Sequence, residues 1–263
     1  MTGSGRGAQA EGAEAEAGQA GAHAEQAGAQ AERAGAGAER AGAQAEPVGP
    51  VTGLLLAAGG GRRLGGRPKA LLRHRGRPLV EHAVRVLRDG GCERVHVVLG
   101  ASAERVRAEA DLTGCLVVDN PAWEEGMGSS LRAGLGPLVE ESGTGTSGTA
   151  GLPGAGLPGA AGLPGAVLVM LVDQPGIGPE AVARVRAAYW SPASLVSAAY
   201  HGRRGHPVLF GADHWAGVMA GALGDKGART YLAAHADALT LVECADVAEP
   251  FDIDTPEDLA RLD

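Results

Sequence analysis

One seven-residue segment constrains the fold of this chain more than any other. Residues Ala166–Val172 read AVLVMLV, an unbroken apolar run in which polar and apolar positions do not alternate. A strand that is buried on both faces has this pattern, and such strands are typical of parallel sheets covered by helices on each side. The segment therefore predicts a central strand of an α/β domain.

Other short apolar segments alternate with amphipathic ones on both sides of this strand. We expect further strands at Thr52–Ala57, Arg94–Leu99, Leu116–Val118, Ser194–Ser197, Pro207–Phe210 and Leu239–Glu243. We expect helices at Pro78–Arg88, Ala103–Ala110, Ser129–Glu140, Pro179–Tyr189, Arg229–His235 and Pro256–Leu262. Strands that alternate with helices predict a three-layer α/β fold with a mostly parallel central sheet, which binds its ligands at the carboxyl ends of the strands.

Two stretches of low complexity interrupt the α/β pattern. Residues 23–50 repeat a seven-residue unit with alanine at its apolar positions. The second stretch, residues 142–165, contains the unit GLPGA three times, and the last unit ends at Ala166. Alanine and glycine have little apolar area to bury, so the seven-residue repeat does not favour a coiled coil. We expect residues 1–50 to be a disordered Ala/Gly/Glu-rich tail, and residues 51–263 to form one domain with a flexible Gly/Pro-rich insertion at 142–165.

Composition excludes several classes of protein. The net charge of −8 and an aromatic content of 3% argue against a nucleic-acid-binding protein. The apolar runs are far shorter than the ~20 residues of a membrane-spanning helix, and the first residues lack the apolar core of a secretory signal. The three cysteines have no C-x-x-C spacing, which favours inert core thiols over disulfides or a zinc site. We therefore expect a cytoplasmic protein with no nucleic-acid and no membrane partner.

A glycine-rich loop with four basic residues follows the first expected strand, at residues 59–69. Backbone N–H groups of such a loop can approach an anion closely, and the basic side chains add positive charge. The glycine spacing does not fit the dinucleotide-binding pattern G-x-G-x-x-G, and Arg67 and Pro68 stand where a P-loop has Lys and Ser or Thr. We expect a phosphate-binding loop of another kind; an ordinary turn with solvated arginines is the alternative.

Acidic residues stand at two places where a metal ion could bind. Asp173 directly follows the AVLVMLV strand, and Asp252 and Asp254 flank one residue just before the last expected helix. In an extended segment the latter two would point to the same side. Magnesium takes one or two carboxylates together with substrate phosphates, so these residues are candidate ligands. The alternatives are that Asp173 caps a helix and that the other two only stabilise a helix N-terminus.

The stretch from Leu56 to Lys69 resembles the signature loop of the MobA-like nucleotidyltransferases. Further blocks resemble the molybdenum cofactor cytidylyltransferase branch of that superfamily, and they follow in the same order. They are DNPxW at 119–123, GMGSSL at 126–131, DQP at 173–175, GHPVLF at 205–210, GDKGAR at 224–229 and DIDTPED at 252–258. The resemblance covers about residues 52–262 and implies a Rossmann-like nucleotidyltransferase fold.

The resemblance also implies a reaction. A cytidylyl group would move from CTP to the terminal phosphate of molybdenum-loaded molybdopterin, which yields molybdopterin cytosine dinucleotide and pyrophosphate. Mg²⁺ is the implied cofactor, with Mn²⁺ as a possible replacement, and a recipient molybdoenzyme is a possible partner. Ala58 stands where the guanylyl-transferring branch tends to have glycine, which favours CTP over GTP.

The resemblance assigns site residues by their place in these blocks. Arg63, Lys69 and Asp173 are the expected catalytic residues, and Asp173, Asp252 and Asp254 are the expected metal ligands, with Asp252 favoured over Asp254 as the second one. Substrate contacts are expected from Gly126, Met127 and His206, although His206 could equally be a residue at a strand entry. The expected nucleotide-binding residues are Leu56, Ala57, Ala58, Gly59, Gly61, Arg63, Lys69, Asn120 and Ser130.

Other functions fit parts of the same pattern. The acceptor could be a sugar phosphate or another phosphorylated compound, and the transferred group could be guanylyl. A non-catalytic chaperone that binds the cofactor for a molybdoenzyme is a further alternative. The joint presence of Arg63, Lys69 and Asp173 argues for an enzyme.

Overall fold

The computed structural model describes residues 49–143 and 163–262. The expected tail lies outside these residues except for Gly49 and Pro50, and so does the expected insertion between residues 144 and 162. Ser142 and Gly143, which we had placed in the insertion, belong instead to the helix before it. In the part of the chain that the structure describes, no helix is long and apolar enough to cross a membrane.

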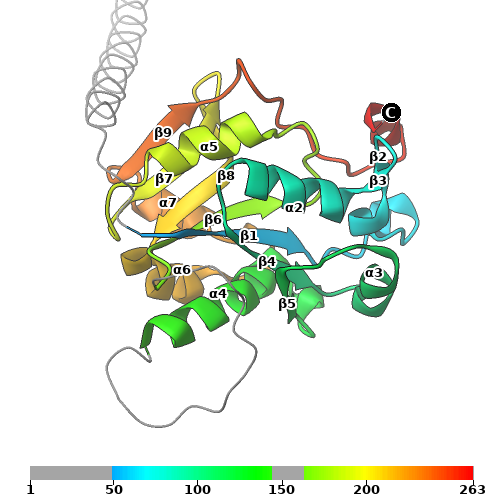
Figure 1. Cartoon of the computed structure of the whole chain (residues 1–263), viewed down its shortest axis with the longest axis horizontal. Coiled ribbons are helices and arrows are strands. Elements are labelled where there is room, and N and C mark those ends of the chain that lie inside the picture. The colour runs from blue at the N-terminus through cyan, green and yellow to red at the C-terminus, as the bar shows by residue number, and fades with distance from the viewer. Residues whose placement is uncertain (1–48, 144–162, 263) are drawn as a thin grey trace, which may run out of the picture. The chain divides into compact units, whose positions relative to one another are not determined.

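A seven-stranded sheet forms the centre of the described domain (Figure 1). Its order is β5-β4-β1-β6-β8-β7-β9, and only β8 runs antiparallel to its two neighbours. The carboxyl ends of the other six strands therefore lie at one edge, as expected for a mostly parallel sheet. The strands are β1 (Val51–Ala57), β4 (Arg94–Leu99), β5 (Cys115–Asp119), β6 (Ala166–Leu171), β7 (Leu195–Tyr200), β8 (Arg203–Gly211) and β9 (Leu239–Glu243).

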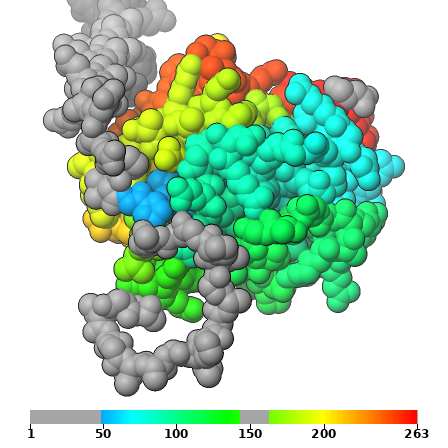
Figure 2. Space-filling model, viewed as in Figure 1, coloured from blue at the N-terminus to red at the C-terminus, as the bar shows by residue number. Residues whose placement is uncertain are grey.

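Helices cover both faces of this sheet, which confirms the three-layer α/β fold. Helices α2 (Leu79–Asp89), α3 (Ala103–Glu109) and α5 (Pro179–Ala187) bury apolar side chains in the core on one face. The core on the other face takes side chains from α4 (Met127–Gly143), α6 (Trp215–Gly221) and α7 (Arg229–Ala234). In the space-filling view a small blue patch marks the start of the described residues, and the neighbouring segments hide the strand β1 that follows (Figure 2).

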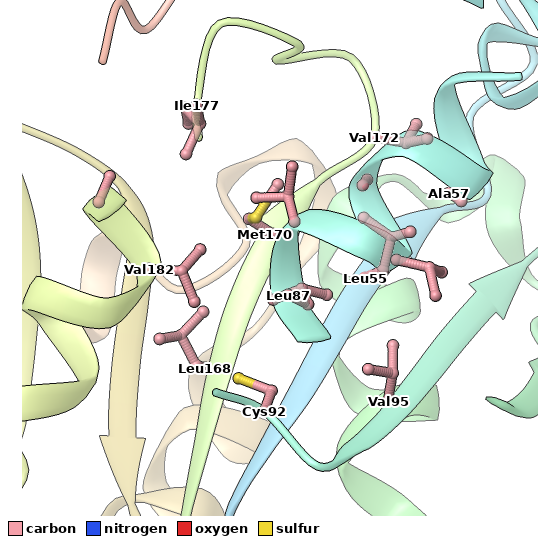
Figure 3. Packing of buried hydrophobic residues seen from close by; sticks show 14 of the residues in the cluster. Leu55, Ala57, Leu87, Cys92, Val95, Leu168, Met170, Val172, Ile177 and Val182 are labelled. Carbon is pink, nitrogen blue, oxygen red and sulfur yellow. The ribbon is translucent and has the colours of Figure 1, made fainter. Parts of the chain in front are cut away.

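The two central strands are buried because both of their faces meet helices. Strand β1 is buried at every position, and β6 pairs with it in parallel from Ala166 to Leu171. Leu168 and Met170 of β6 point toward the same core as Leu55 of β1 and Leu87 of α2 (Figure 3). The AVLVMLV run is thus a strand without a solvent-facing side, as the sequence predicted.

Several features differ from the sequence predictions, and one of them is strand β7, which runs from Leu195 to Tyr200 and not from Ser194 to Ser197. Strand β8 begins at Arg203 and not at Pro207, because it forms a hairpin with β7. Helix α6 was not predicted, since its sequence WAGVMAG has two glycines and no clear start signal. A small hairpin of β2 (Arg73–His74) and β3 (Arg77–Pro78) was also missed. The last helix is a short 3-10 helix, Glu257–Arg261.

Candidate active site

The glycine-rich loop leaves the carboxyl end of β1 and folds back on itself. The carbonyl oxygen of Gly61 accepts hydrogen bonds from the backbone N–H groups of Leu64 (2.8 Å) and Gly66 (3.1 Å). Gly61 has a φ of 58°, and a Cβ atom at this position would lie 1.9 Å from the carbonyl oxygen of Arg67. Only glycine fits there. Leu64 is buried beneath the turn, so the loop is anchored while Arg63 extends into solvent with a side chain 77% exposed.

Lys69 lies at the centre of a charged cluster formed by segments far apart in the sequence. Its side-chain Nζ donates a hydrogen bond of 2.6 Å to Asp173 Oδ2 and another to Asp254 Oδ1. The lysine side chain is only 14% exposed, so these two carboxylates replace most of its water. The Arg63 guanidinium lies 3.7 Å from the other carboxylate oxygen of Asp254. The structure therefore brings all three expected catalytic residues to one place.

A backbone hydrogen bond fixes the acidic segments against each other. Asp173 follows β6 at the carboxyl edge of the sheet, and its carbonyl accepts the N–H of Ile253 at 2.9 Å. Ile253 is fully buried, which anchors the segment between Asp252 and Asp254. The Asp252 carboxylate accepts a 2.8 Å hydrogen bond from Gln174 Nε2. Both aspartates that flank Ile253 therefore belong to the charged cluster around Asp173.

The charges of this cluster raise the pKa values of Lys69 and Asp252. They oppose the effect of burial at the lysine and add to it at the aspartate. Burial alone would lower the pKa of Lys69, but its contacts with Asp173 and Asp254 raise the pKa above the ordinary value. The pKa of Asp252 is raised, first by burial and further by the negative charges of Asp173 and Asp254. Three carboxylates around one lysine leave an excess of negative charge, which an additional cation would relieve.

The donor set fits a hard divalent cation when substrate phosphates complete the shell. Asp173 and Asp252 supply carboxylate oxygens, and the side-chain oxygen of Gln174 is buried without a hydrogen-bond partner in the described part of the chain. Among residues 49–143 and 163–262, no three His, Cys, Asp or Glu side chains are grouped so that they could hold a metal by themselves. Magnesium sites with one or two carboxylates and several phosphate or water oxygens have this character.

Two of the expected nucleotide-binding residues, Asn120 and Ser130, are hydrogen-bonded to each other. Asn120 is 3% exposed, and its Nδ2 donates to Ser129 Oγ (2.9 Å) and Ser130 Oγ (3.0 Å). Its Oδ1 accepts the N–H of Ala122. These hydrogen bonds connect the end of β5 to the first turn of α4. Asn120 and Ser130 therefore hold the start of this helix in place.

The remaining expected nucleotide-binding residues surround the start of the glycine-rich loop. Leu56, Ala57 and Ala58 are buried, and the Ala58 carbonyl accepts the N–H of Ala101 at 3.0 Å. Gly59 is exposed, and a Cβ atom there would meet nothing within 4 Å. The loop thus offers open space directly after a rigid strand end.

Two of the three expected acceptor-side residues border one large cleft beside the charged cluster, and the third, Gly126, does not line it. Met127 and His206 line this cleft, which has a volume of about 1110 Å³, and Gly126 packs against the loop at Gly224 and Asp225. Burial lowers the pKa of His206 to about 4, although the nearby Asp252 opposes this shift, so the imidazole is neutral at pH 7.

Several polar residues of this cleft had received no individual role from the sequence. Among them are Gln174, Arg203, Arg204, Lys226 and Arg229. Gln174 directly follows Asp173, and the basic residues stand in or beside blocks that carried the family resemblance. Their position next to these blocks was a usable signal, but their convergence on one cleft depends on the β7–β8 hairpin and on the packing of α7.

An α/β fold of this kind, with a lysine–carboxylate cluster next to a glycine-rich loop at the strand ends, defines a nucleotidyltransferase. Residues 53–239 match the family model described as the MobA-like NTP transferase domain. The chain belongs to this family, which binds nucleoside triphosphates, and the superfamily expected from the sequence is confirmed.

Individual relatives extend this finding over most of the chain. Nicotine blue oxidoreductase of Paenarthrobacter nicotinovorans is 39% identical over 219 residues, which are 81% of this chain and 96% of the relative. The crystal structure of a homologue of Mycobacterium tuberculosis Rv0371c, from Mycobacterium sp. strain JC1, is 27% identical and superposes with a TM-score of 0.63, covering 81% of this chain and 94% of that one. Rv0371c itself has been solved in complex with manganese; it is 26% identical, with a TM-score of 0.57, over 81% of this chain and 97% of that one.

Proposed function

We propose that this protein transfers a cytidylyl group from CTP to the phosphate of molybdenum-loaded molybdopterin, with release of pyrophosphate. The observation that carries the proposal is the contact of Lys69 with Asp173 and Asp254 beside the glycine-rich loop. This arrangement suits a reaction in which two anions must approach each other. The GMGSSL and GHPVLF blocks and the methyl group of Ala58 support the choice of cytidylyl transfer.

The residues around Lys69 can organise the triphosphate without a strong general base. The acceptor is already an anionic phosphate, so one of its oxygens can attack the α-phosphorus directly while the bond to the β-phosphate oxygen breaks. The loop amides, Arg63 and Lys69 hold the triphosphate and neutralise charge that develops on the leaving pyrophosphate. His206, neutral at pH 7, contributes a hydrogen bond on the acceptor side and adds no charge.

Asp173 and Asp252 would hold the divalent cation, Mg²⁺ or Mn²⁺, with Asp254 as the alternative second ligand. When bound, the cation supplies further neutralisation at the phosphates. The manganese complex of Rv0371c supports this expectation. Two or three such elements, each worth ~3 kcal/mol, would lower the barrier by roughly 6–9 kcal/mol, which is about 10⁴–10⁶-fold in rate.

Mass analysis of the product formed from CTP and molybdenum-loaded molybdopterin tests the proposal. We expect the cytosine dinucleotide and one pyrophosphate per turnover. The Asp173→Asn variant should bind CTP only modestly more weakly but turn over at least ~100-fold more slowly. Asp213→Asn, a change at an exposed aspartate outside the site, is the matched control. Turnover with GTP alone would refute cytidylyl transfer, and undiminished turnover of Asp173→Asn would remove Asp173 from the mechanism.

A second candidate is an oxidoreductase reaction on nicotine blue, as the name of one relative states for that protein. The 39% identity to nicotine blue oxidoreductase over 81% of the chain favours it. The test follows the absorbance of nicotine blue with NADH or NADPH as the electron donor. Dye reduction without pyrophosphate release from any nucleotide would select this candidate. Pyrophosphate release with a sugar phosphate as acceptor would select a different acceptor, and tight binding without either reaction would select a cofactor chaperone.

A further inference from the structure

One short segment of this acidic chain is strongly basic. Residues 62–77 contain seven of the 23 basic residues and none of the 31 acidic ones, so the rest of the chain has a net charge of −15. Lys69 of this segment belongs to the charged cluster, and Arg63 lies next to Asp254. The β2–β3 hairpin at the end of the segment adds three arginines that the proposed reaction does not use.

The hairpin is firmly attached to the domain. His74 of β2 is buried, and its Nδ1 is hydrogen-bonded to the carbonyl oxygen of Leu262 at 2.9 Å, so the hairpin stands beside the last described residues (Figure 1). The His74 ring also meets the ring of His82 on α2 edge to face, with 4.9 Å between the centroids. Across the turn, Arg73 Nη1 donates to the Gly76 carbonyl at 2.9 Å. The hairpin therefore presents its exposed side chains on a fixed backbone.

Arg75 stands at a position that favours other residue types. It forms the two-residue turn of the hairpin together with Gly76, and the two residues have φ values of 49° and 80°. Turns with two positive φ values favour Asn, Asp or Gly, because other L-residues are strained there. No ion pair or hydrogen bond of the Arg75 side chain within the described residues compensates this strain. Strain of this kind is retained where a residue has a function.

The three arginines of the hairpin are accessible to a partner. Arg73, Arg75 and Arg77 are exposed, and within residues 49–143 and 163–262 none of them forms an ion pair. A guanidinium group can bind a carboxylate through two parallel hydrogen bonds. In a chain of net charge −8, three unpaired arginines on one rigid hairpin indicate an anionic partner.

A groove beside the hairpin indicates what kind of anion this partner is. The groove has a volume of about 280 Å³ and continues from the hairpin along α2. Its charged residues have both signs, and they are Arg77, Glu81, Arg85, Arg88, Asp89 and Asp111. The surface of a protein carries charges of both signs and can match such a groove, whereas a polyphosphate backbone has no positive group for its aspartates.

Nucleic acid and membrane lipid lack their usual contacts on this surface. Residues 57–122 contain no Phe, Tyr or Trp on which a base could stack. In the part of the chain that the structure describes, the exposed large apolar side chains all lie outside residues 62–88, so this surface has none to insert into lipid. These observations favour a protein as the anionic partner.

We propose that the β2–β3 hairpin and the groove beside it bind the acidic face of another protein. Arg73, Arg75 and Arg77 pair with carboxylates of that face, and the groove on α2 receives side chains of both signs. This inference goes beyond the proposed reaction and does not depend on it, because none of the three arginines belongs to the charged cluster around Lys69.

Fluorescence anisotropy of a labelled peptide of alternating Glu and Ala, titrated with the full chain, tests the surface. Replacing Arg73, Arg75 and Arg77 together by Gln should weaken peptide binding at least ~10-fold. The control replaces Arg203, Arg204 and Arg229 by Gln; these are also exposed and without an ion pair among the described residues, so the same charge is removed. The control should weaken binding no more than about twofold. Equal weakening by both variants would show unspecific attraction and overturn the proposal.

The Arg75→Gly variant separates function from stability. Glycine relieves the strain of the turn, so Tm should rise by about 2–4 °C while the peptide binds more weakly. A merely structural arginine would not combine these two effects. Peptide binding as tight as that of the unchanged protein would overturn the proposal.

Other anions and the reaction itself complete the test. Binding of oligodeoxythymidine or phosphatidylserine vesicles should change less than peptide binding in the hairpin variant, and an equal or larger loss would assign the surface to nucleic acid or lipid and overturn the proposal. The hairpin variant should release pyrophosphate from CTP with an unchanged KM; a raised KM would show that the arginines attract the substrate, which also overturns it. If the unchanged protein turns over no nucleotide, the proposed reaction fails, and the peptide measurements still decide this inference.

Discussion

Replacement of Lys69 by methionine should destabilise the protein, slow its reaction and strengthen its binding of a divalent cation. The lysine ammonium lies between Asp173 and Asp254, and Asp252 is close enough for its pKa to be raised by both. Methionine keeps the length of the side chain but removes the positive charge. The three carboxylates then repel each other with no internal cation to balance them.

The magnitude follows from the burial of this cluster. Removing one partner of a fully buried ion pair costs about 3–5 kcal/mol, but the Asp254 side chain is 41% exposed and solvent screens its charge. We therefore expect a loss of about 2 kcal/mol, which corresponds to a decrease in Tm of roughly 4–8 °C for a domain of this size. Loss of the charge at the phosphates should reduce turnover at least ~100-fold.

Thermal unfolding with and without Mn²⁺ measures these effects. The carboxylates that Lys69 no longer occupies should bind Mn²⁺ more tightly, so Mn²⁺ should raise the Tm of the variant more than that of the unchanged protein. Lys226→Met, at an exposed lysine without an ion pair among the described residues, is the control for stability. A Tm within 1 °C of the original value and an equal response to Mn²⁺ would refute this account of the cluster.

Two further predictions concern other parts of the chain. A protein that lacks residues 1–50 should keep its activity, since no candidate site residue lies there; loss of turnover in the reaction assay would show that the tail contributes. His96 is buried and its pKa is lowered to about 4, below the unfolded value near 6.5, so its contribution to stability is complete above pH 6.5 and is lost as the pH falls toward 4. Urea unfolding measures the free energy of unfolding at pH 7 and at pH 4.5. Between these pH values it should fall by about 2–3 kcal/mol more in the unchanged protein than in His96→Gln. Equal decreases in the two proteins would contradict this assignment.

Several strands could be predicted because a buried strand produces a short run of apolar residues in the local sequence. Arg94–Leu99 and Leu239–Glu243 have the bounds that the apolar pattern gave, and Ala166–Leu171 differs by one residue. Helix α6 was missed because tertiary packing determines it. Trp215 is 2% exposed, and its Nε1 donates to the carbonyl of Phe210, so the core fixes a segment whose own helix propensity is low.

The sequence named the members of the charged cluster as candidates, but it could not predict the contacts between them. Lys69 and Asp254 are 185 residues apart, and no local pattern could show that the lysine would sit between two carboxylates expected to bind a metal. Likewise, Asn120 fits a nucleotide contact by its place in the DNPxW block, yet its amide is used by Ser129 and Ser130. A polar residue in a motif can bind the ligand itself, or it can position another residue that contacts the ligand. Only the hydrogen bonds in the structure distinguish these two roles.

Two glycines of the GMGSSL block show why this block lies next to residues 222–225. A Cβ atom at Gly126 would lie 2.4 Å from Asp225 Oδ1, and one at Gly128 would lie 2.6 Å from the carbonyl oxygen of Ala222. The start of α4 and the glycine before it therefore touch the backbone of residues 222–225, and Arg132 of α4 also donates to the Ala222 carbonyl. Because α4 is also bonded to Asn120 at the end of β5, the helix start links this strand end to residues 222–225 beside the cleft. A side chain at Gly128 would separate α4 from this segment, and the cleft would lose its shape although every charged residue remained.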